Sequence, residues 1–301
     1  MRGLVWLGRL PKWMLSLVAW KITLLALLLG GYRGKVVRAN LRRAFPEWSS
    51  WKRWQTYASF QRHFAQLLVE SAKLFTMTRP EASKGVTHDN RELFETLHAE
   101  GRHVLVAGGH VNNWEWSALT FQDAVPHRVM GLYKRMSDQH AERRMRESRG
   151  RMGMELVRTT EGRAWMNVAR HGDPVAVIMG FDQSPADPTK CWWTEFLGTE
   201  TAVFYGLEQW SRLYDMAVVF GKIRRDGPWR YTVTYELVTK NAAALNEGEV
   251  LDRCLGMLED QIFEDPSRWL WSHRRWKHAR PDSQPFHPRS ASPQADGEDL
   301  T

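Results

Sequence analysis

A histidine and a glutamate, His110 and Glu115, stand five residues apart directly after a short apolar run. The run, residues 103–107, has the length and β-branched content of a buried strand. Gly108 and Gly109 follow it and allow a sharp turn. We therefore expect the histidine in a strand-to-helix loop and the glutamate in the first helical turn, where the two side chains converge. A carboxylate beside an imidazole fixes its tautomer and stabilises its cation, as a general base requires.

That spacing alone is equally compatible with a surface contact or a helix cap. The whole stretch, residues 108–115, reads GGHVNNWE. It resembles the His-x-x-x-x-Asp/Glu signature of the lysophospholipid-acyltransferase superfamily, in the form carried by the bacterial lipid A biosynthesis acyltransferases of the lauroyl and myristoyl type. The resemblance implies that His110 is the general base, that Glu115 is its carboxylate partner and that Asn113 contacts substrate.

An arginine-glycine pair follows a strongly basic segment, at the place where members of that family carry an arginine before a glycine. A hydroxyl that attacks a thioester produces an oxyanion, and a fixed guanidinium stabilises such a charge. The resemblance therefore implies an oxyanion role for Arg149. The alternative is a solvated basic face, because several more arginines lie beside it, at Arg143, Arg144, Arg146 and Arg151.

Two further blocks resemble family motifs. Asp182 and Gln183 follow the apolar run 174–179, and loops at the carboxyl ends of strands are where α/β sheets place ligands. Phe196 and Gly198 belong to a Phe-x-Gly block that leads into a predicted helix, whose N-terminus suits an anionic group. We expect all four residues to bind substrate. A simple Asx turn and an ordinary helix entry would produce the same letters.

The stretch 269–277 reads WLWSHRRWK and resembles the family's C-terminal block. Arginines beside tryptophans suit an anionic headgroup at a membrane interface, so we expect Arg274 and Arg275 to bind the acceptor. His273 is a rival candidate base, but it lacks an acid at motif spacing. The alternative for this stretch is a structural role. Together the blocks cover residues 32–280 in the family's order.

Composition limits the class of partner. The chain has 301 residues, of which 43% are hydrophobic, and this suffices for one substantial core. A net charge of +8 suggests an acidic partner: nucleic acid, an anionic membrane, or an acidic carrier or lipid. Sixteen tryptophans favour lipid, and no nucleic-acid-binding motif is recognisable. Cys191 and Cys254 form neither a disulfide framework nor a zinc motif, so we expect no metal.

The N-terminal segment 13–29 is almost wholly apolar. Its length in a helix is roughly 26 Å, which is marginal for spanning a bilayer. Lys21 lies near the middle, and basic residues flank both ends, which favours an in-plane or tilted helix. Residues 30–33 make a poor signal-peptide cleavage site, so we expect a retained anchor.

Strand-like and helix-like segments then alternate with short loops, which predicts an α/β fold with a mainly parallel or mixed sheet. The predicted strands are 103–107, 129–133, 155–157, 174–179, 217–223 and 230–238. The predicted helices after the anchor are 32–46, 57–74, 90–99, 138–149, 162–171, 203–214 and 248–264. The resemblance implies a glycerolipid-acyltransferase-like mixed sheet flanked by helices. We expect three parts: a membrane anchor helix (1–31), a catalytic domain (32–280) and a disordered tail (281–301), the last rich in Ser, Pro and Asp.

The resemblance implies transfer of a fatty acyl chain from an acyl carrier protein thioester to a lipid hydroxyl, most simply a secondary acylation in lipid A biosynthesis. It implies no cofactor, an anionic lipid acceptor, and a position on the cytoplasmic face of the bacterial inner membrane. Two alternatives stay open. One is acylation of an amino-acid-based or glycerol-based lipid. The other is a non-enzymatic membrane protein that grips anionic lipid, which leaves the GGHVNNWE turn without a purpose.

Overall fold

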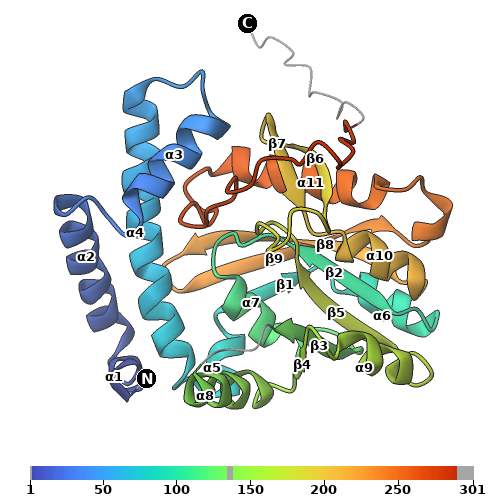
Figure 1. Ribbon diagram of the computed structural model, residues 1–301. Helices are drawn as coiled ribbons and strands as arrows, with labels where there is room; N and C mark the ends of the chain where they lie inside the picture. The colour runs from blue at the N-terminus through green and yellow to red at the C-terminus, as the bar shows by residue number, and fades with distance from the viewer. Residues whose placement is uncertain (1, 134–137, 290–301) are drawn as a thin grey trace, which may run out of the picture.

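The computed structural model describes residues 2–133 and 138–289. Within them a seven-stranded mixed sheet has the order β1-β9-β8-β2-β5-β3-β4 (Figure 1). Its strands are β1 (Val86–Asp89), β2 (Val104–Gly108), β3 (Arg128–Tyr133), β4 (Glu155–Arg158), β5 (Val175–Gly180), β8 (Ala217–Gly227) and β9 (Arg230–Thr239). Neighbouring strands run parallel, except that β8 and β9 are antiparallel. Strand β2 therefore lies between β5 and β8, in the interior of the sheet.

Helices cover both faces of the sheet (Figure 1). The helices of the described residues are α1 (Arg2–Gly8), α2 (Lys12–Leu28), α3 (Gly34–Ala44), α4 (Ser50–Leu74), α5 (Arg79–Ser83), α6 (Glu92–Ala99), α7 (Trp114–Phe121), α8 (Gln139–Gly150), α9 (Gly162–Ala169), α10 (Gly206–Leu213) and α11 (Glu249–Glu264). A short 3-10 helix, η1 (Ala242–Ala244), precedes α11. One hydrophobic core lies under α10 and α11 and the other under α6 and α7. Strand β2 serves both, because successive side chains point to opposite faces: Leu105 faces one core and Val106 the other.

Helix α4 stands at one side of the sheet and carries α2 on its outer surface (Figure 1). It contributes Phe60 to one core and Val69 to the other. Helix α2 buries only a narrow stripe against it, which includes Leu15 and Ala19. No helix among the described residues is long and apolar enough to cross a membrane.

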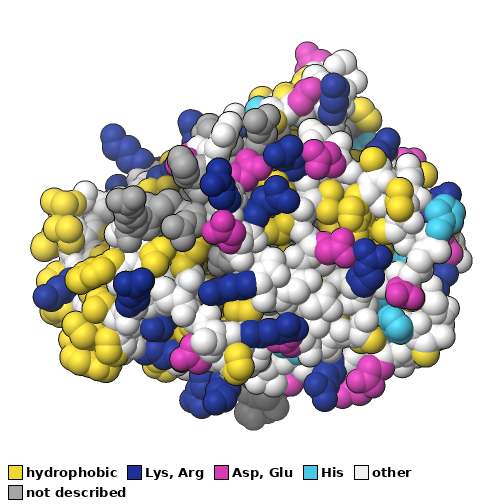
Figure 2. Space-filling view, turned by 90° about the horizontal axis from the view of Figure 1, so that it is seen from below, with side chains coloured by type: hydrophobic (Ala, Val, Ile, Leu, Met, Phe, Trp, Pro, Cys, Tyr) yellow, Lys and Arg dark blue, Asp and Glu magenta, His cyan; other side chains and the backbone are white. Residues whose placement is uncertain are grey.

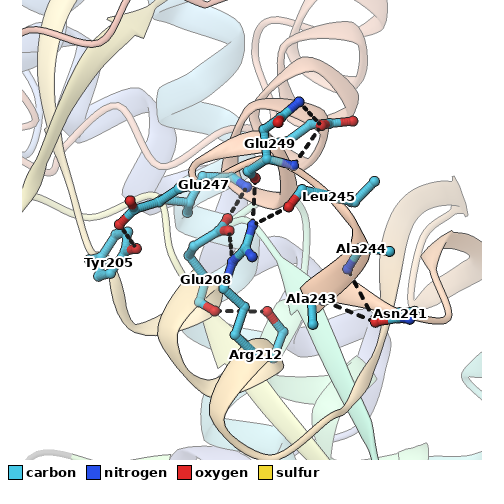
Figure 3. Close-up of polar contacts among 12 residues, drawn as sticks. Tyr205, Glu208, Arg212, Asn241, Ala243, Ala244, Leu245, Glu247 and Glu249 are labelled. Atoms are coloured by element: carbon cyan, nitrogen blue, oxygen red, sulfur yellow. Dashed lines mark hydrogen bonds and ion pairs between the residues drawn. The ribbon is translucent and has the colours of Figure 1, made fainter.

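The position of α11 is fixed by a buried acid on α10 (Figure 3). Glu208 accepts hydrogen bonds from Arg212 Nε at 2.6 Å and from the Leu251 backbone N–H at 3.2 Å. The same guanidinium donates to the carbonyl oxygen of Leu245 at 2.9 Å, in the loop before α11. A buried carboxylate with several donors is well compensated for its loss of water. This cluster therefore sets where α11, and Leu258 on it, meets the strand ends.

The predicted α/β architecture is confirmed, with a sheet that is mixed rather than purely parallel. Three strands and the short helix α5 were missing from the prediction. Strand β1 pairs with β9 at the sheet edge, and β6 (Trp192–Phe196) and β7 (Thr199–Val203) form a separate hairpin. The predicted helix 203–214 consequently begins later, at Gly206, because the β-branched residues before it pair as a strand.

The last described residues, 281–289, lie against the fold. The ring of His287 stacks on Trp192 with centroids 3.5 Å apart. Arg289 forms an ion pair with Glu259 of α11 at 2.5 Å. The rest of the expected tail, 290–301, lies outside the described residues, as do residues 134–137 before α8.

Candidate active site

The turn that carries His110 joins the buried strand β2 to helix α7. Gly109 has no room for a side chain, because a Cβ atom there would lie 2.4 Å from Cδ1 of Leu258. Asn112 has a left-handed backbone with φ of 54°, which asparagine tolerates better than most residues. Asn113 caps α7 by accepting a hydrogen bond from a backbone N–H of its first turn. The local sequence thus holds His110 at the carboxyl-terminal edge of the sheet.

Asp182 is the carboxylate that contacts the His110 ring. Its Oδ1 lies 2.5 Å from His110 Nδ1. Its Oδ2 accepts hydrogen bonds from the His110 backbone N–H at 2.8 Å and from the indole N–H of Trp269 at 2.7 Å. The Asp182 side chain is buried, with 2% of its surface exposed. Because a carboxylate accepts the Nδ1 proton, this arrangement favours the tautomer whose Nε2 is free to act as a base.

The two groups support each other's charged forms. Burial is the largest influence on the His110 pKa and lowers it, but the charge and hydrogen bond of Asp182, with a further contribution from Glu115, raise it above the ordinary value. For Asp182, burial raises the pKa, while the charge of His110 and the hydrogen bonds from His110 and Trp269 bring it below the ordinary value. The site therefore stabilises the imidazolium that forms when His110 accepts a proton.

Glu115 lies in the first turn of α7 and forms an ion pair with Arg149, in the last turn of α8. The structure thus differs from the expected contact between Glu115 and the His110 ring. The reason is the start of α7 at Trp114, which directs Glu115 toward α8. Asp182, in contrast, follows a strand that runs parallel beside β2, so the two strand ends bring Asp182 and His110 together.

Gln183 lies at the other nitrogen of the ring. Its Nε2 is 3.1 Å from Nε2 of His110, so the amide donates a hydrogen bond to the base nitrogen. Trp114 packs edge-on against the ring at 5.0 Å between centroids. Gln183 therefore occupies the hydrogen-bonding position at Nε2 that any group donating a proton to the ring would need.

The C-terminal block WLWSHRRWK builds the wall behind this turn. Besides the bond from Trp269 to Asp182, the Leu270 N–H donates to the His110 carbonyl oxygen at 3.0 Å. The Asn112 N–H donates to the Arg268 carbonyl oxygen at 3.0 Å. These bonds make the block and the residue before it part of the support for the His110 turn.

His273, the rival base, is engaged in the fold. Its Nε2 accepts a hydrogen bond from the Ser184 N–H at 2.9 Å. Burial lowers the pKa of His273 to about 4, against the opposing charge of Asp182. His273 is thus neutral at pH 7 with its accepting nitrogen already occupied. No group of three His, Cys, Asp or Glu side chains within residues 2–133 and 138–289 is arranged to hold a metal ion.

The other residues expected at the substrate take different places. Asn113 uses its amide to donate to Glu70 at 2.7 Å, and Phe196 is buried. Arg275 is buried beside the Phe196 ring and donates to the Ala202 carbonyl oxygen at 2.7 Å. Gly198 lies at the exposed tip of the β6–β7 hairpin with φ of 66°. Arg274 is exposed, and so stays available to an anionic ligand.

An apolar cavity opens beside His110, between the sheet and α7. The cavity has a volume of about 140 Å³, several times what one water molecule needs. Its walls are mainly apolar, formed among others by Val106, Phe121, Ile178, Ile223 and Val233. A cavity of this size and lining suits a hydrocarbon rather than a polar group.

The sequence analysis did not identify Glu70, a buried acid that contacts the His110 turn through Asn113. Glu70, on α4, accepts hydrogen bonds from Asn113 Nδ2 and from the Tyr231 hydroxyl, both at 2.7 Å. Burial raises the pKa of Glu70, and these donors oppose the rise. A glutamate at a core position of the predicted helix 57–74 was the available signal, since such a position rarely holds an unpaired acid.

Comparisons with known proteins agree with the geometry. The chain matches the family model described as bacterial lipid A biosynthesis acyltransferase over residues 2–278. It is 22% identical over 279 residues to the lipid A biosynthesis palmitoleoyltransferase of Escherichia coli (strain K12), covering 91% of this chain and 89% of the relative. It is equally similar, over the same coverage, to the lipid A biosynthesis acyltransferase of Shigella flexneri. The family model covers nearly the whole described chain and the site presents a base beside an apolar cavity, so the chain belongs to the bacterial lipid A biosynthesis acyltransferase family.

Proposed function

We propose that the protein transfers a fatty acyl chain from an acyl carrier protein thioester to a hydroxyl of a lipid A precursor, as a late, secondary acylation. The observation that carries the proposal is the His110–Asp182 pair at the mouth of an apolar cavity. A base beside a hydrocarbon site is what acyl transfer to a hydroxyl requires.

In the proposed reaction, His110 Nε2 takes the proton of the acceptor hydroxyl while the hydroxyl oxygen attacks the thioester carbonyl. The new C–O bond forms, the C–S bond breaks, and the imidazolium returns the proton to the leaving thiolate. Asp182 keeps the Nδ1 proton in place throughout and stabilises the cation. The acceptor hydroxyl displaces the Gln183 amide from Nε2, and Gln183 then remains beside it to hold it.

The ion pair of Arg149 and Glu115 holds a cation near the His110 turn, because Glu115 lies in the first turn of the helix that follows it. We assign Arg149 to the oxyanion that develops during attack, with Glu115 holding the guanidinium in place. Glu115 also adds a negative charge that favours the His110 cation. Their side chains are only partly exposed, at 24% and 35%, so the pair is not a freely solvated surface contact.

The donor is proposed to be a carrier protein because Arg149 lies in the last turn of the basic helix α8. Arg143 and Arg146 are exposed on it, and acyl carriers are acidic. Attraction of this kind mainly raises the rate of encounter and weakens as salt shortens the Debye length from about 10 Å at 0.1 M to about 3 Å at 1 M.

The test of the donor compares kcat/KM for carrier-bound and coenzyme A-bound acyl groups over that salt range. Replacing Arg143 and Arg146 with glutamine should reduce the carrier preference at low salt. The matched control is Arg230→Gln, which replaces an exposed arginine at the first position of β9. A carrier preference that ignores both salt and the double substitution would remove α8 as the docking surface.

Membrane attachment is proposed through residues 1–31 lying in the plane of the interface, with 32–280 as the catalytic domain. Figure 2 shows hydrophobic side chains gathered on the side of the molecule that carries α1 and α2. Trp13, Trp20 and Leu28 are 65%, 62% and 73% exposed there. Exposed cations follow on α3, at Lys35, Arg38 and Arg42. An apolar face bordered by cations suits an anionic lipid surface, here the cytoplasmic face of the inner membrane.

The decisive experiment incubates the purified protein with an acyl-loaded carrier protein and a lipid A precursor that lacks its secondary chains. Mass spectrometry should show a precursor heavier by one acyl chain. The rate at which this product forms should fall at least about 10²-fold in His110→Ala. Acylation of an amino-acid or glycerol lipid instead, with the lipid A precursor untouched, would replace the proposed acceptor. Lipid binding without transfer to any acceptor would overturn the enzymatic proposal.

A further inference from the structure

Three neighbouring strands carry a glycine at the same level of the sheet. Gly180 of β5 is the register partner of Gly108 of β2. A Cβ atom on Gly108 would lie 3.7 Å from the carbonyl oxygen of Gly221, on β8 at the other side. The sheet order β5-β2-β8 therefore makes these glycines a row across the strands. Because none of them has a side chain, the row leaves a trough in the face of the sheet that α7 covers.

The trough is the base of the apolar cavity beside His110. Gly180 lies directly against the His110 ring, since a Cβ atom there would come within 3.0 Å of His110 Cε1. Helix α7 roofs the trough with Ser117, Ala118 and Phe121. The cavity thus runs across the strands, from the base on the β5 side toward β9.

Tyr235 of β9 lies at the far end of the trough. Its hydroxyl is 2.8 Å from His88 Nδ1, and His88 Nε2 is 2.9 Å from the Thr120 hydroxyl. Phe94 packs edge-on against the tyrosine ring at 4.9 Å. Burial lowers the pKa of His88 to about 4, so the ring is neutral at pH 7. Tyr235, which forms the end wall of the trough, is therefore fixed by its contacts with His88 and Phe94. The polar groups of this wall are paired with each other rather than turned toward a ligand.

We propose that the glycine row holds the hydrocarbon of the acyl donor and that Tyr235 limits it to a straight chain of medium length. This inference rests on the proposed acyl transfer. From β5 to β9 there are three strand spacings of about 4.8 Å, which is roughly 14 Å. With C–C bonds of about 1.5 Å in a zigzag that advances ~1.3 Å per bond, that span takes about eleven bonds, which join about twelve carbons. Decanoyl and dodecanoyl groups match that span in length, and palmitoyl exceeds it.

Two conservative substitutions test the trough without disturbing the fold. A Cβ atom on Gly221 would meet Tyr235 Cε1 at 3.5 Å, and one on Gly108 would meet its nearest atom at 3.7 Å, both ordinary contacts. Neither glycine has a positive φ. Alanine at either position therefore fills the trough and leaves the backbone as it is. Gly172→Ala is the matched control, because its added methyl also meets ordinary contacts, at 3.6 Å, on an exposed turn.

The measurement is kcat/KM for a ladder of saturated donors from octanoyl to palmitoyl. Wild type and Gly172→Ala should peak at decanoyl or dodecanoyl. Gly221→Ala, near the end wall, should move the peak to shorter donors, with a loss of about fourfold for each methylene that no longer fits, so that octanoyl transfer loses least. Gly108→Ala, near the base, should slow every donor in the ladder.

Tyr235→Leu provides a change in the opposite direction, because a smaller end wall should move the peak to longer donors. Displacement of a fluorescent fatty acid by free acids of the same ladder measures the same preference without turnover. If wild-type protein transfers no donor at all, the proposed function fails. If it transfers acyl groups but the ladder is flat, or Gly221→Ala and Tyr235→Leu leave the peak in place, the chain-length inference alone is overturned.

Discussion

Replacing Asp182 with asparagine should disable the base without changing its shape. Oδ2 of Asp182 accepts two fixed donors, the His110 backbone N–H and the Trp269 indole. An asparagine must place its carbonyl oxygen there, because its NH2 group cannot accept. The NH2 group then faces His110 Nδ1, which lies 2.5 Å from Oδ1 in the wild type. The ring has to accept at Nδ1 and carry its proton on Nε2, so no base nitrogen is left for the acceptor hydroxyl.

The size of the effect follows from the loss of general-base catalysis. We expect kcat/KM to fall by about 10²–10⁴-fold, which is ~2.7–5.4 kcal/mol of transition-state stabilisation. The assay is the initial rate of acyl transfer at several pH values, alongside thermal unfolding. Nitrogen NMR shifts of the His110 ring should report the exchange of tautomers directly.

The control for this prediction is Asp187→Asn, the same substitution at an exposed aspartate of the same loop, which should leave the rate unchanged. A loss smaller than tenfold in a folded Asp182→Asn protein would refute the reasoning. So would a wild-type Nε2–H tautomer, since the base nitrogen would then have to be assigned elsewhere.

Three other predictions follow from the same contacts. Because the pKa of His110 lies above 6.5 and only the neutral ring accepts a proton, activity should fall as the pH drops through a value above 6.5; a midpoint below 6.5 in the free enzyme would contradict this. Glu115→Gln and Arg149→Ala should each lower kcat by about 10²-fold with little change in acceptor KM, and the double variant should lose little more; fully additive losses would show that the two act separately. Trp20→Glu should release the protein from anionic vesicles while Val168→Glu, at a still more exposed position on α9, should not; equal sedimentation of both variants would place the lipid contact elsewhere.

Much of the fold was predictable because its strands are buried on both faces. Apolar β-branched runs such as 174–179 indicate interior strands regardless of what they pair with. The hairpin of β6 and β7 was not predictable in the same way. Its residues Trp192–Phe196 alternate weakly and pair only with each other, outside the main sheet. Local pattern carries little information about such a unit.

The site was predictable as a set of residues but not as a set of contacts. Asp182 was expected at the substrate, whereas the structure places it on the His110 ring. That contact depends on β5 lying next to β2, and periodicity along the chain does not encode the order of strands. Arg275 shows the same limit: an arginine beside tryptophans reads as a headgroup ligand, yet its neighbours fold around it and bury it.

The hydrogen bonds that join the His110 turn to residues 268–270 can form only after those residues have been synthesised. Strand β2 and His110 are made early, but β2 gains its neighbour β8 only after α10, and Asp182 gains the Trp269 indole later still. Contacts so far apart in sequence form late in folding, because each closes a long loop. The exposed hydrophobic helices α1 and α2 precede all of them on the ribosome. Under the proposed membrane attachment, the nascent chain meets a lipid surface before Asp182 has gained all its partners, so His110 obtains its supporting contacts only after the chain has reached the membrane.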